Sequence, residues 1–319
     1  MDPVTHTLVG ATLARSGLRK RTALGTATLL IAVNAPDIDA IAYLWGNTTA
    51  VGLRRGVTHG VVALIVLPLV LTGLMVLWDR LARGPAERKT NPLVAGQVLF
   101  LAALAVATHP LLDFFNSYGM RFFAPLSFEW FYGDTLFIID PWVWAALISG
   151  LWMARGSERA PKLALTGVVF YALVMAGSNV AARSIVASQV ERSGNAVMRL
   201  MAAPVAATPF SRWVVVEDEV GYQVGLFSWL PRPRLELSRL PYDHEPPASF
   251  GADLAGDPEV RRFLSWARFP YYAVWKQGDS HVIAIGDARY TVDPEESWAS
   301  LRVTIPSVGR RSADEPPIR

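Results

Sequence analysis

Seven ionisable side chains of only two kinds, imidazole and carboxylate, stand inside or beside the long apolar segments of this chain. They are His6, Asp37, Asp39, His59, His109, Asp113 and Asp140. A charge at the centre of a bilayer costs a few kcal/mol, so such residues usually face a protein cavity and mark function. Imidazole nitrogens together with carboxylate oxygens suit zinc, with manganese or iron as alternatives. The residue types therefore predict a site for one or two divalent ions.

Spacing along the chain decides which of these side chains can reach a common ion. His109 and Asp113 lie four residues apart in "ATHPLLDFFNSYG", so both point to one face of a helix. Asp37 and Asp39 are two residues apart and would diverge by about 200° on a regular helix. Pro36 is expected to distort the helix there. That distortion would let both carboxylates turn inward or bridge two ions.

The distance of each residue from the nearest basic flank gives its depth, because a helix rises about 1.5 Å per residue. Five of the residues fall roughly 22–32 Å from such a flank. They are Asp37, Asp39, His59, His109 and Asp140. This depth is one layer near the outer edge of an apolar core about 30 Å thick. His6 lies closer to its flank, roughly 14 Å away, and fits the layer less well.

Several of these residues also have a purely structural interpretation. A histidine in a helix bundle often donates a hydrogen bond to a neighbouring helix, and this alternative weighs most for His6. Asp140 precedes Pro141 and could cap the start of a helix. Arg54 and Arg55 could hold an anionic substrate or contact lipid head groups.

Long apolar segments must position these side chains. The chain has 319 residues, of which 52% are hydrophobic and only 18% are charged. Five segments have the roughly 20 apolar residues that a membrane span needs. They are residues 22–45, 57–79, 93–115, 136–154 and 163–182. A shorter helix over 3–15 is expected to enter the bundle only part of the way. The fold class predicted is an all-α polytopic membrane bundle.

Basic residues predict the orientation of this bundle. They are concentrated in segments 15–21, 80–92 and 155–162 and are sparser in the loops between, which makes the rich segments cytoplasmic by the positive-inside rule. Five spans then place the C-terminal part of this multi-pass protein outside, in the periplasm or its equivalent. A net charge of +3, spread over short clusters, argues against nucleic acid as a partner.

Composition changes after the fifth segment and predicts four regions. They are a membrane bundle with a metal site over 1–182, a connecting helix over 183–202, an extracytoplasmic β-rich domain over 203–305 and a disordered tail over 306–319. Alternating apolar and polar residues predict strands around Gly221, over 271–292 and over 299–306. Residues 246–259 are expected to form a loop.

Four motifs in order carry a family resemblance. "THTLVGATLA", "APDIDAI", "RRGVTHG" and "THPLLDFFNSYGMRFFAPLS" resemble the predicted membrane-bound metal-dependent hydrolases, the inner-membrane group noted as LexA-regulated. The resemblance covers about residues 1–182. It implies one set of metal ligands: His6, Asp37, Asp39, His59, His109 and Asp113. This chain has Arg54 where the family usually has a histidine, and if that histidine is a ligand in the family, one coordination position is lost here.

The sequence therefore predicts hydrolysis by a metal-activated water. Asp39 or Asp113 would take the proton, and Arg55 would stabilise a developing anionic charge. Arg54 and Asp140 would surround the ligands. A phosphoester or another lipid-linked anion would suit a site at the outer interface, with membrane lipids as the other partner. The alternative is a non-catalytic transporter or assembly factor that carries a structural metal.

Overall fold

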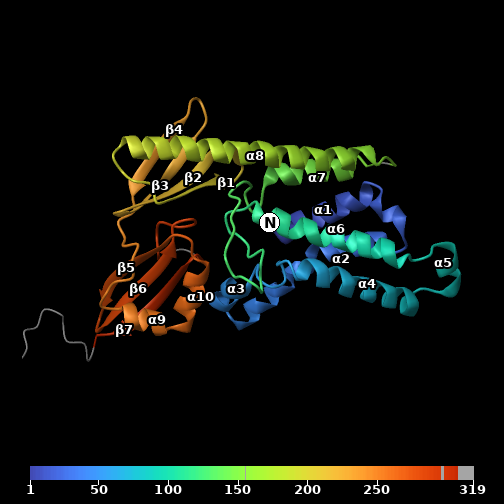
Figure 1. The fold of residues 1–319 in the computed structure, drawn as a ribbon, viewed down its shortest axis with the longest axis horizontal. Coiled ribbons are helices and arrows are strands. Elements are labelled where there is room, and N and C mark those ends of the chain that lie inside the picture. Colours follow the sequence, from blue (N-terminus) through green and yellow to red (C-terminus); the bar gives the residue numbers. More distant parts are fainter. Residues whose placement is uncertain (155, 296–297, 308–319) are drawn as a thin grey trace, which may run out of the picture.

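The computed structural model describes residues 1–154, 156–295 and 298–307. Figure 1 shows helices gathered at one end of the molecule and two β-sheets at the other. A single long helix, α8, runs along both ends. The N-terminus lies near the middle of the view, close to where the two halves meet.

The helical half contains eight α-helices and two 3₁₀ segments within the described residues. They are α1 (Pro3–Arg15), η1 (Leu18–Arg21), α2 (Gly25–Asn34), η2 (Ala35–Trp45), α3 (Asn47–Leu53), α4 (Ala63–Ala82), α5 (Pro85–Thr90), α6 (Ala95–Phe114), α7 (Pro141–Trp152) and α8 (Arg159–Arg192). Aspartates cap two of these helices. Asp2 accepts hydrogen bonds from the first-turn amides of α1, and Asp140 does so for α7.

Four helical stretches are long and apolar enough to cross a membrane. They are Gly25–Trp45, Ala63–Ala82, Ala95–Phe114 and Arg159–Arg192. The expected segment over 136–154 forms only α7, whose 12 residues are fewer than the roughly 20 of a full crossing. The reason is that residues 136–140 form no helix and α7 begins only after its Asp140 cap.

The outward faces of the long helices are apolar. On α4, Ile65, Leu69 and Leu77 are exposed. On α8, Phe170 and Leu173 are each 67% exposed. Apolar surface on this scale is unusual for a water-soluble monomer and indicates contact with lipid or another protein. A membrane protein is the simplest account of these faces.

Two of the expected spans change their backbone at the residues of interest. The helix expected over 22–45 becomes a 3₁₀ segment at Ala35, immediately before Pro36, so the distortion predicted there is confirmed. The helix expected from residue 57 begins only at Ala63, and 57–62 form turns. Close packing explains the turn: a Cβ on Gly60 would lie 2.1 Å from the Ala124 carbonyl oxygen.

The other half holds two antiparallel sheets. The first has the order β1 (Arg199–Val205), β2 (Thr208–Asp218), β3 (Gly221–Ser228) and β4 (Arg234–Arg239). The second has the order β5 (Pro270–Gln277), β6 (Ser280–Asp287) and β7 (Ser300–Pro306). The predicted strands around Gly221, over 271–292 and over 299–306 are thus confirmed. The loop expected over 246–259 is wrong, because α9 (Gly251–Gly256) and the start of α10 (Pro258–Trp266) form there.

The boundary between the halves differs from the prediction. No separate connecting helix occupies 183–202 in the described chain, because α8 runs unbroken to Arg192 and β1 begins at Arg199. Arg212 on β2 is fully buried and donates to the backbone oxygens of Met175, Ala202 and Asp134 at 2.7–3.2 Å. This guanidinium therefore ties the first sheet to α8. The predicted tail lies outside the described residues from 308 onward.

Candidate metal centre

Four separate segments bring the predicted ligands together at one end of the bundle. The segments are α1 with His6, η2 with Asp37 and Asp39, the turn after α3 with His59, and the end of α6 with His109 and Asp113. All three imidazoles are 0% exposed. His6 stacks on His109 with ring centroids 3.7 Å apart. His6, whose predicted depth fitted the layer less well, therefore lies within this cluster.

The contacts of two histidines indicate which nitrogen is available. His109 Nδ1 lies 2.6 Å from the Val33 carbonyl oxygen, so Nδ1 carries the proton in the neutral ring. His59 Nδ1 lies 3.3 Å from Asp39 Oδ2 and 3.0 Å from the Thr58 hydroxyl, and a proton on Nδ1 would face the carboxylate. The two Nε2 atoms face one another at 3.1 Å. With both rings protonated on Nδ1, two lone pairs would meet at this distance, and a metal ion between them would stabilise the arrangement.

Asp113 completes a triangle with these two nitrogens. Its Oδ2 lies 3.3 Å from His59 Nε2 and 3.5 Å from His109 Nε2. With zinc–ligand distances of about 2.0–2.1 Å, two ligands of a tetrahedral site are roughly 3.3 Å apart. The three edges of the triangle therefore match one face of such a site.

Further potential ligands surround the triangle. Asp37 Oδ1 is 3.9 Å from His59 Nε2 and 3.8 Å from His109 Nε2. His6 Nε2 is 3.3 Å from Asp113 Oδ1, and the α-amino group of Met1 forms an ion pair with the same oxygen. Two groups of ligand atoms each lie within 4.8 Å, His6–His109–Asp113 and Asp37–His59–His109. They share His109, so the arrangement suits one ion or an adjacent pair.

Unsatisfied atoms support the same interpretation. Buried polar groups nearly always have hydrogen-bond partners, so exceptions need an explanation. His6 Nε2, Asp37 Oδ2, Asp39 Oδ1 and Asp113 Oδ2 are all buried without a hydrogen bond. Two of these oxygens have an arginine nearby, since Asp113 Oδ2 lies 3.0 Å from Arg55 Nε and Asp39 Oδ1 lies 3.5 Å from Arg54 Nε. The four atoms together fit a metal centre.

Asp39 lies behind the ligand groups. Its Oδ2 accepts hydrogen bonds from the Arg55 amide at 2.8 Å and from the Thr58 hydroxyl at 3.0 Å, besides facing His59 Nδ1. A carboxylate on the second nitrogen of a ligating histidine orients the ring and raises its basicity. Asp39 belongs to neither group of mutually close ligand atoms.

The two arginines hold the carboxylates in place. Arg54 Nη2 donates to Asp37 Oδ1 at 2.5 Å. Arg55 is 3% exposed; its Nε is 3.0 Å from Asp113 Oδ2, and its Nη1 donates to Asn116 Oδ1 at 2.8 Å. Thus Arg54, which replaces the histidine expected from the family resemblance, forms an ion pair with a candidate ligand.

Asp140 lies apart from this set. Its Oδ1 accepts from the amides of Trp142 and Val143, and Tyr171 donates to Oδ2 at 3.3 Å. The N-cap interpretation left open by the sequence therefore describes its contacts. Sequence reasoning missed Thr58 and Asn116, although both stand inside the quoted motifs, next to His59 and three residues after Asp113.

Fold and site together define a membrane protein with a buried histidine–aspartate cluster that could hold a metal ion. Residues 1–184 match the family described as YdjM inner membrane protein, and the chain belongs to that family. A distant relative, "Uncharacterized protein YfhP" of Bacillus subtilis (strain 168), is 25% identical over 176 residues, which are 52% of this chain and 50% of that protein. The match thus spans half the length of the relative. No solved structure matches the chain.

Proposed function

We propose that this protein is a membrane-embedded, metal-dependent hydrolase whose centre holds zinc through His59, His109 and Asp113. The observation that carries the proposal is the pair of Nε2 atoms that face each other at 3.1 Å, with Asp113 Oδ2 3.3 and 3.5 Å from them. Zinc is preferred because it accepts mixed imidazole and carboxylate ligands, and manganese or iron are the alternatives. His6 and Asp37 would complete the site or hold a second ion.

Each remaining residue has a distinct task in this proposal. A divalent ion supplies a Lewis acid that lowers the pKa of a water molecule to about 7. Asp39 would orient His59, and its Oδ1, which lies 3.5 Å from Arg54 Nε, would take a proton. Arg55 offers positive charge to a developing oxyanion while it positions Asp113. The preference of guanidinium groups for phosphate geometry favours a phosphoester or another anionic, lipid-linked substrate.

The topology proposed has five passes in an inner membrane. α7 would need the non-helical residues 136–140 to complete its crossing. The basic residues next to α1, α4 and the start of α8 would face the cytoplasm, and the β half would lie outside. This orientation puts the metal centre near the outer interface, where a lipid-linked substrate can reach it.

One observation favours a second function, a structural metal that clamps the helices. The three imidazoles are fully buried, and closed sites are typical of structural zinc, whereas catalytic zinc keeps an open position. Among the six candidate ligands, Asp37 has the most exposed side chain, at 11%. A substrate would have to enter from its side.

Metal analysis and a phosphodiesterase assay on the purified full chain separate these functions. The variants are His109→Ala and Asp39→Ala, with His281→Ala as a matched control, because His281 lies on β6 and its Nδ1 contacts the Ser307 hydroxyl. Thermal unfolding is followed for each. A hydrolase predicts that His109→Ala loses metal and cleavage of bis(p-nitrophenyl) phosphate while remaining folded.

The other outcomes are equally clear. Metal loss accompanied by unfolding, with no hydrolysis in the metal-loaded wild type, would support the clamp. Wild-type protein that takes up no divalent metal would leave a proton between the histidines as the explanation and reject both proposals. His281→Ala should behave as the wild type throughout.

A further inference from the structure

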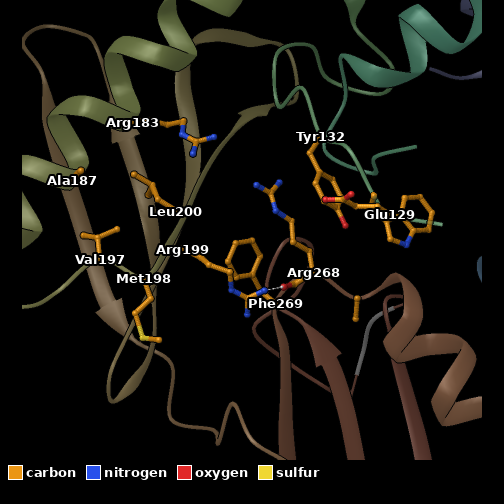
Figure 2. A pocket seen from close by; sticks show the side chains of 12 residues that line it. Glu129, Tyr132, Arg183, Ala187, Val197, Met198, Arg199, Leu200, Arg268 and Phe269 are labelled. Carbon is orange, nitrogen blue, oxygen red and sulfur yellow. Dashed lines mark hydrogen bonds between the residues drawn. The ribbon is translucent and has the colours of Figure 1, made fainter. Parts of the chain in front are cut away.

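A cavity separate from the metal centre lies between the two sheets and α8. It has a volume of about 860 Å³ and is lined by residues of α8, the 129–132 loop, the start of β1 and the segment before β5. Figure 2 shows three arginine side chains entering this space from different segments: Arg183 from α8, Arg199 from β1 and Arg268 from the segment before β5. Such convergence of guanidinium groups suits an anion.

Two of these arginines form ion pairs with acidic residues that do not line the cavity. Each of the two keeps hydrogen-bond donors that these pairs do not use. Asp134, whose side chain is 1% exposed, receives Arg268 Nη1 at 2.9 Å. Glu217 pairs with Arg199 Nε, and Arg199 Nη1 donates to the Arg268 carbonyl oxygen at 2.9 Å. Arg268 Nη2 and Arg199 Nη2 donate to no residue that the structure describes. Pre-oriented guanidinium groups with spare donors form a rigid first contact for a ligand.

Arg183 is the free member of the trio. It makes no hydrogen bond or ion pair within residues 1–154, 156–295 and 298–307. Glu129 is the single acid among the lining residues, so the lining itself is net positive. Tyr132 and Phe269 add aromatic faces, and Arg268 lies 4.2 Å from the Tyr132 ring. The Tyr132 ring therefore helps to hold the Arg268 guanidinium in place.

The position of the cavity indicates where its ligand comes from. Exposed apolar residues continue along α8 as far as Val180, and Arg183 is the first charged residue beyond them. Arginine at the end of an apolar helix surface lies where lipid phosphates are found. The cavity therefore opens at the level of the head groups if α8 is embedded up to Val180.

We propose that this cavity binds a phosphate ester, with Arg183, Arg199 and Arg268 as its ligands. This inference stands apart from the proposed hydrolysis, because it uses none of the metal-centre residues. It would give the protein a second recognition site that selects molecules by their phosphate group.

Calorimetric titration of the full chain in neutral detergent tests the proposal. Three probes are compared: short-chain phosphatidylglycerol, soluble glycerol phosphate, and a short-chain diacylglycerol without phosphate. Arg183→Gln should bind the phosphate probes roughly tenfold more weakly or worse, the loss expected for a charge-assisted hydrogen bond. Arg192→Gln is the matched control, because Arg192 lies on the same helix, is exposed and donates to the Ser188 carbonyl oxygen one turn earlier.

The probes also identify the source of the phosphate. Binding of phosphatidylglycerol but not glycerol phosphate supports a lipid ligand, and binding of both supports a phosphate site open to soluble molecules. Affinity should fall as salt is raised, because the contacts are ionic and partly exposed. Equal binding by Arg183→Gln and Arg192→Gln, or equal binding of the diacylglycerol, would overturn the proposal.

Discussion

Arg289 connects the second sheet to the metal centre, and replacing it with methionine tests that connection. Its guanidinium is 0% exposed and donates to Asp287 Oδ2 at 2.7 Å. The same group donates to the carbonyl oxygens of Ser117 and Tyr118, at 2.9 and 3.2 Å. Tyr118 in turn packs against Arg55, with the guanidinium carbon 4.6 Å from the ring centroid. A contact path thus runs from the sheet to the arginine beside Asp113.

The size of the effect follows from burial. Asp287 is 0% exposed, and removing one partner of a buried ion pair destabilises a protein by about 3–5 kcal/mol. At about 2–4 °C per kcal/mol for domains of 150–250 residues, the thermal midpoint should fall by roughly 10 °C. The pair formed by Asp218 and Arg239 provides the comparison. Arg239 is 38% exposed, and without it the buried Asp218 keeps hydrogen bonds from Gln223 and two backbone amides, so we expect a smaller loss there than at Arg289.

Thermal unfolding of Arg289→Met and Arg239→Met, each with and without added zinc, is the assay. Both variants lose one guanidinium in the β half, but only Arg289→Met loses contact with the loop after α6. Stabilisation by zinc should therefore be smaller for Arg289→Met than for the wild type and unchanged for Arg239→Met. Equal midpoints for the two variants, with equal zinc stabilisation, would refute both the burial argument and the proposed connection.

Three further changes have defined outcomes. Asp39→Asn should reduce zinc affinity by about 10–100-fold, the usual effect of removing the partner of a ligating histidine; an unchanged affinity by competition with a chelator would contradict this role. Gly133→Ala should lower the thermal midpoint, because its Cβ would lie 2.4 Å from the Phe114 carbonyl oxygen, while Gly96→Ala, which meets nothing within 4 Å, should not. Arg239 holds the pKa of Asp218 well below its usual range, so this carboxylate stabilises the fold above its unfolded pKa of about 3.9. That stability should be lost on acidification through the folded pKa, and Asp218→Asn should flatten the unfolding curve against pH in this acid range.

Much of the architecture was predictable because its signals are local. Apolar length marks the long helices, and alternation with turn residues marks the β hairpins. α7 was overestimated because hydropathy ignores the capping signal of Asp140 followed by Pro141. The sequence predicted a separate connecting helix over 183–202 instead of a continuous α8, because the residues after 182 are more polar. Helical propensity nevertheless persists to Arg192. A tertiary contact, invisible in the sequence, supports that part against the first sheet.

The candidate site was predictable as a set of residues but not as a geometry. The depth count along straight helices placed His59 in the same layer as the other ligands. It assumed that His59 lies in a spanning helix, whereas His59 lies on a turn. His6 reaches the cluster by stacking on His109, which its depth alone did not indicate. The roles proposed for Asp37, Asp39 and Asp113 depend on differences of a few tenths of an ångström between interatomic distances. Such distances arise from packing and leave no trace in residue spacing.

The unbroken course of α8 has a mechanical consequence. Its 34 residues form a rod about 51 Å long, and Arg212 fixes the first sheet to it at Met175. A rod without a joint transmits tilt and rotation along its whole length. A force on the sheets should therefore tilt the apolar half of this helix. A change in the thickness of a surrounding bilayer should tilt the sheets in return.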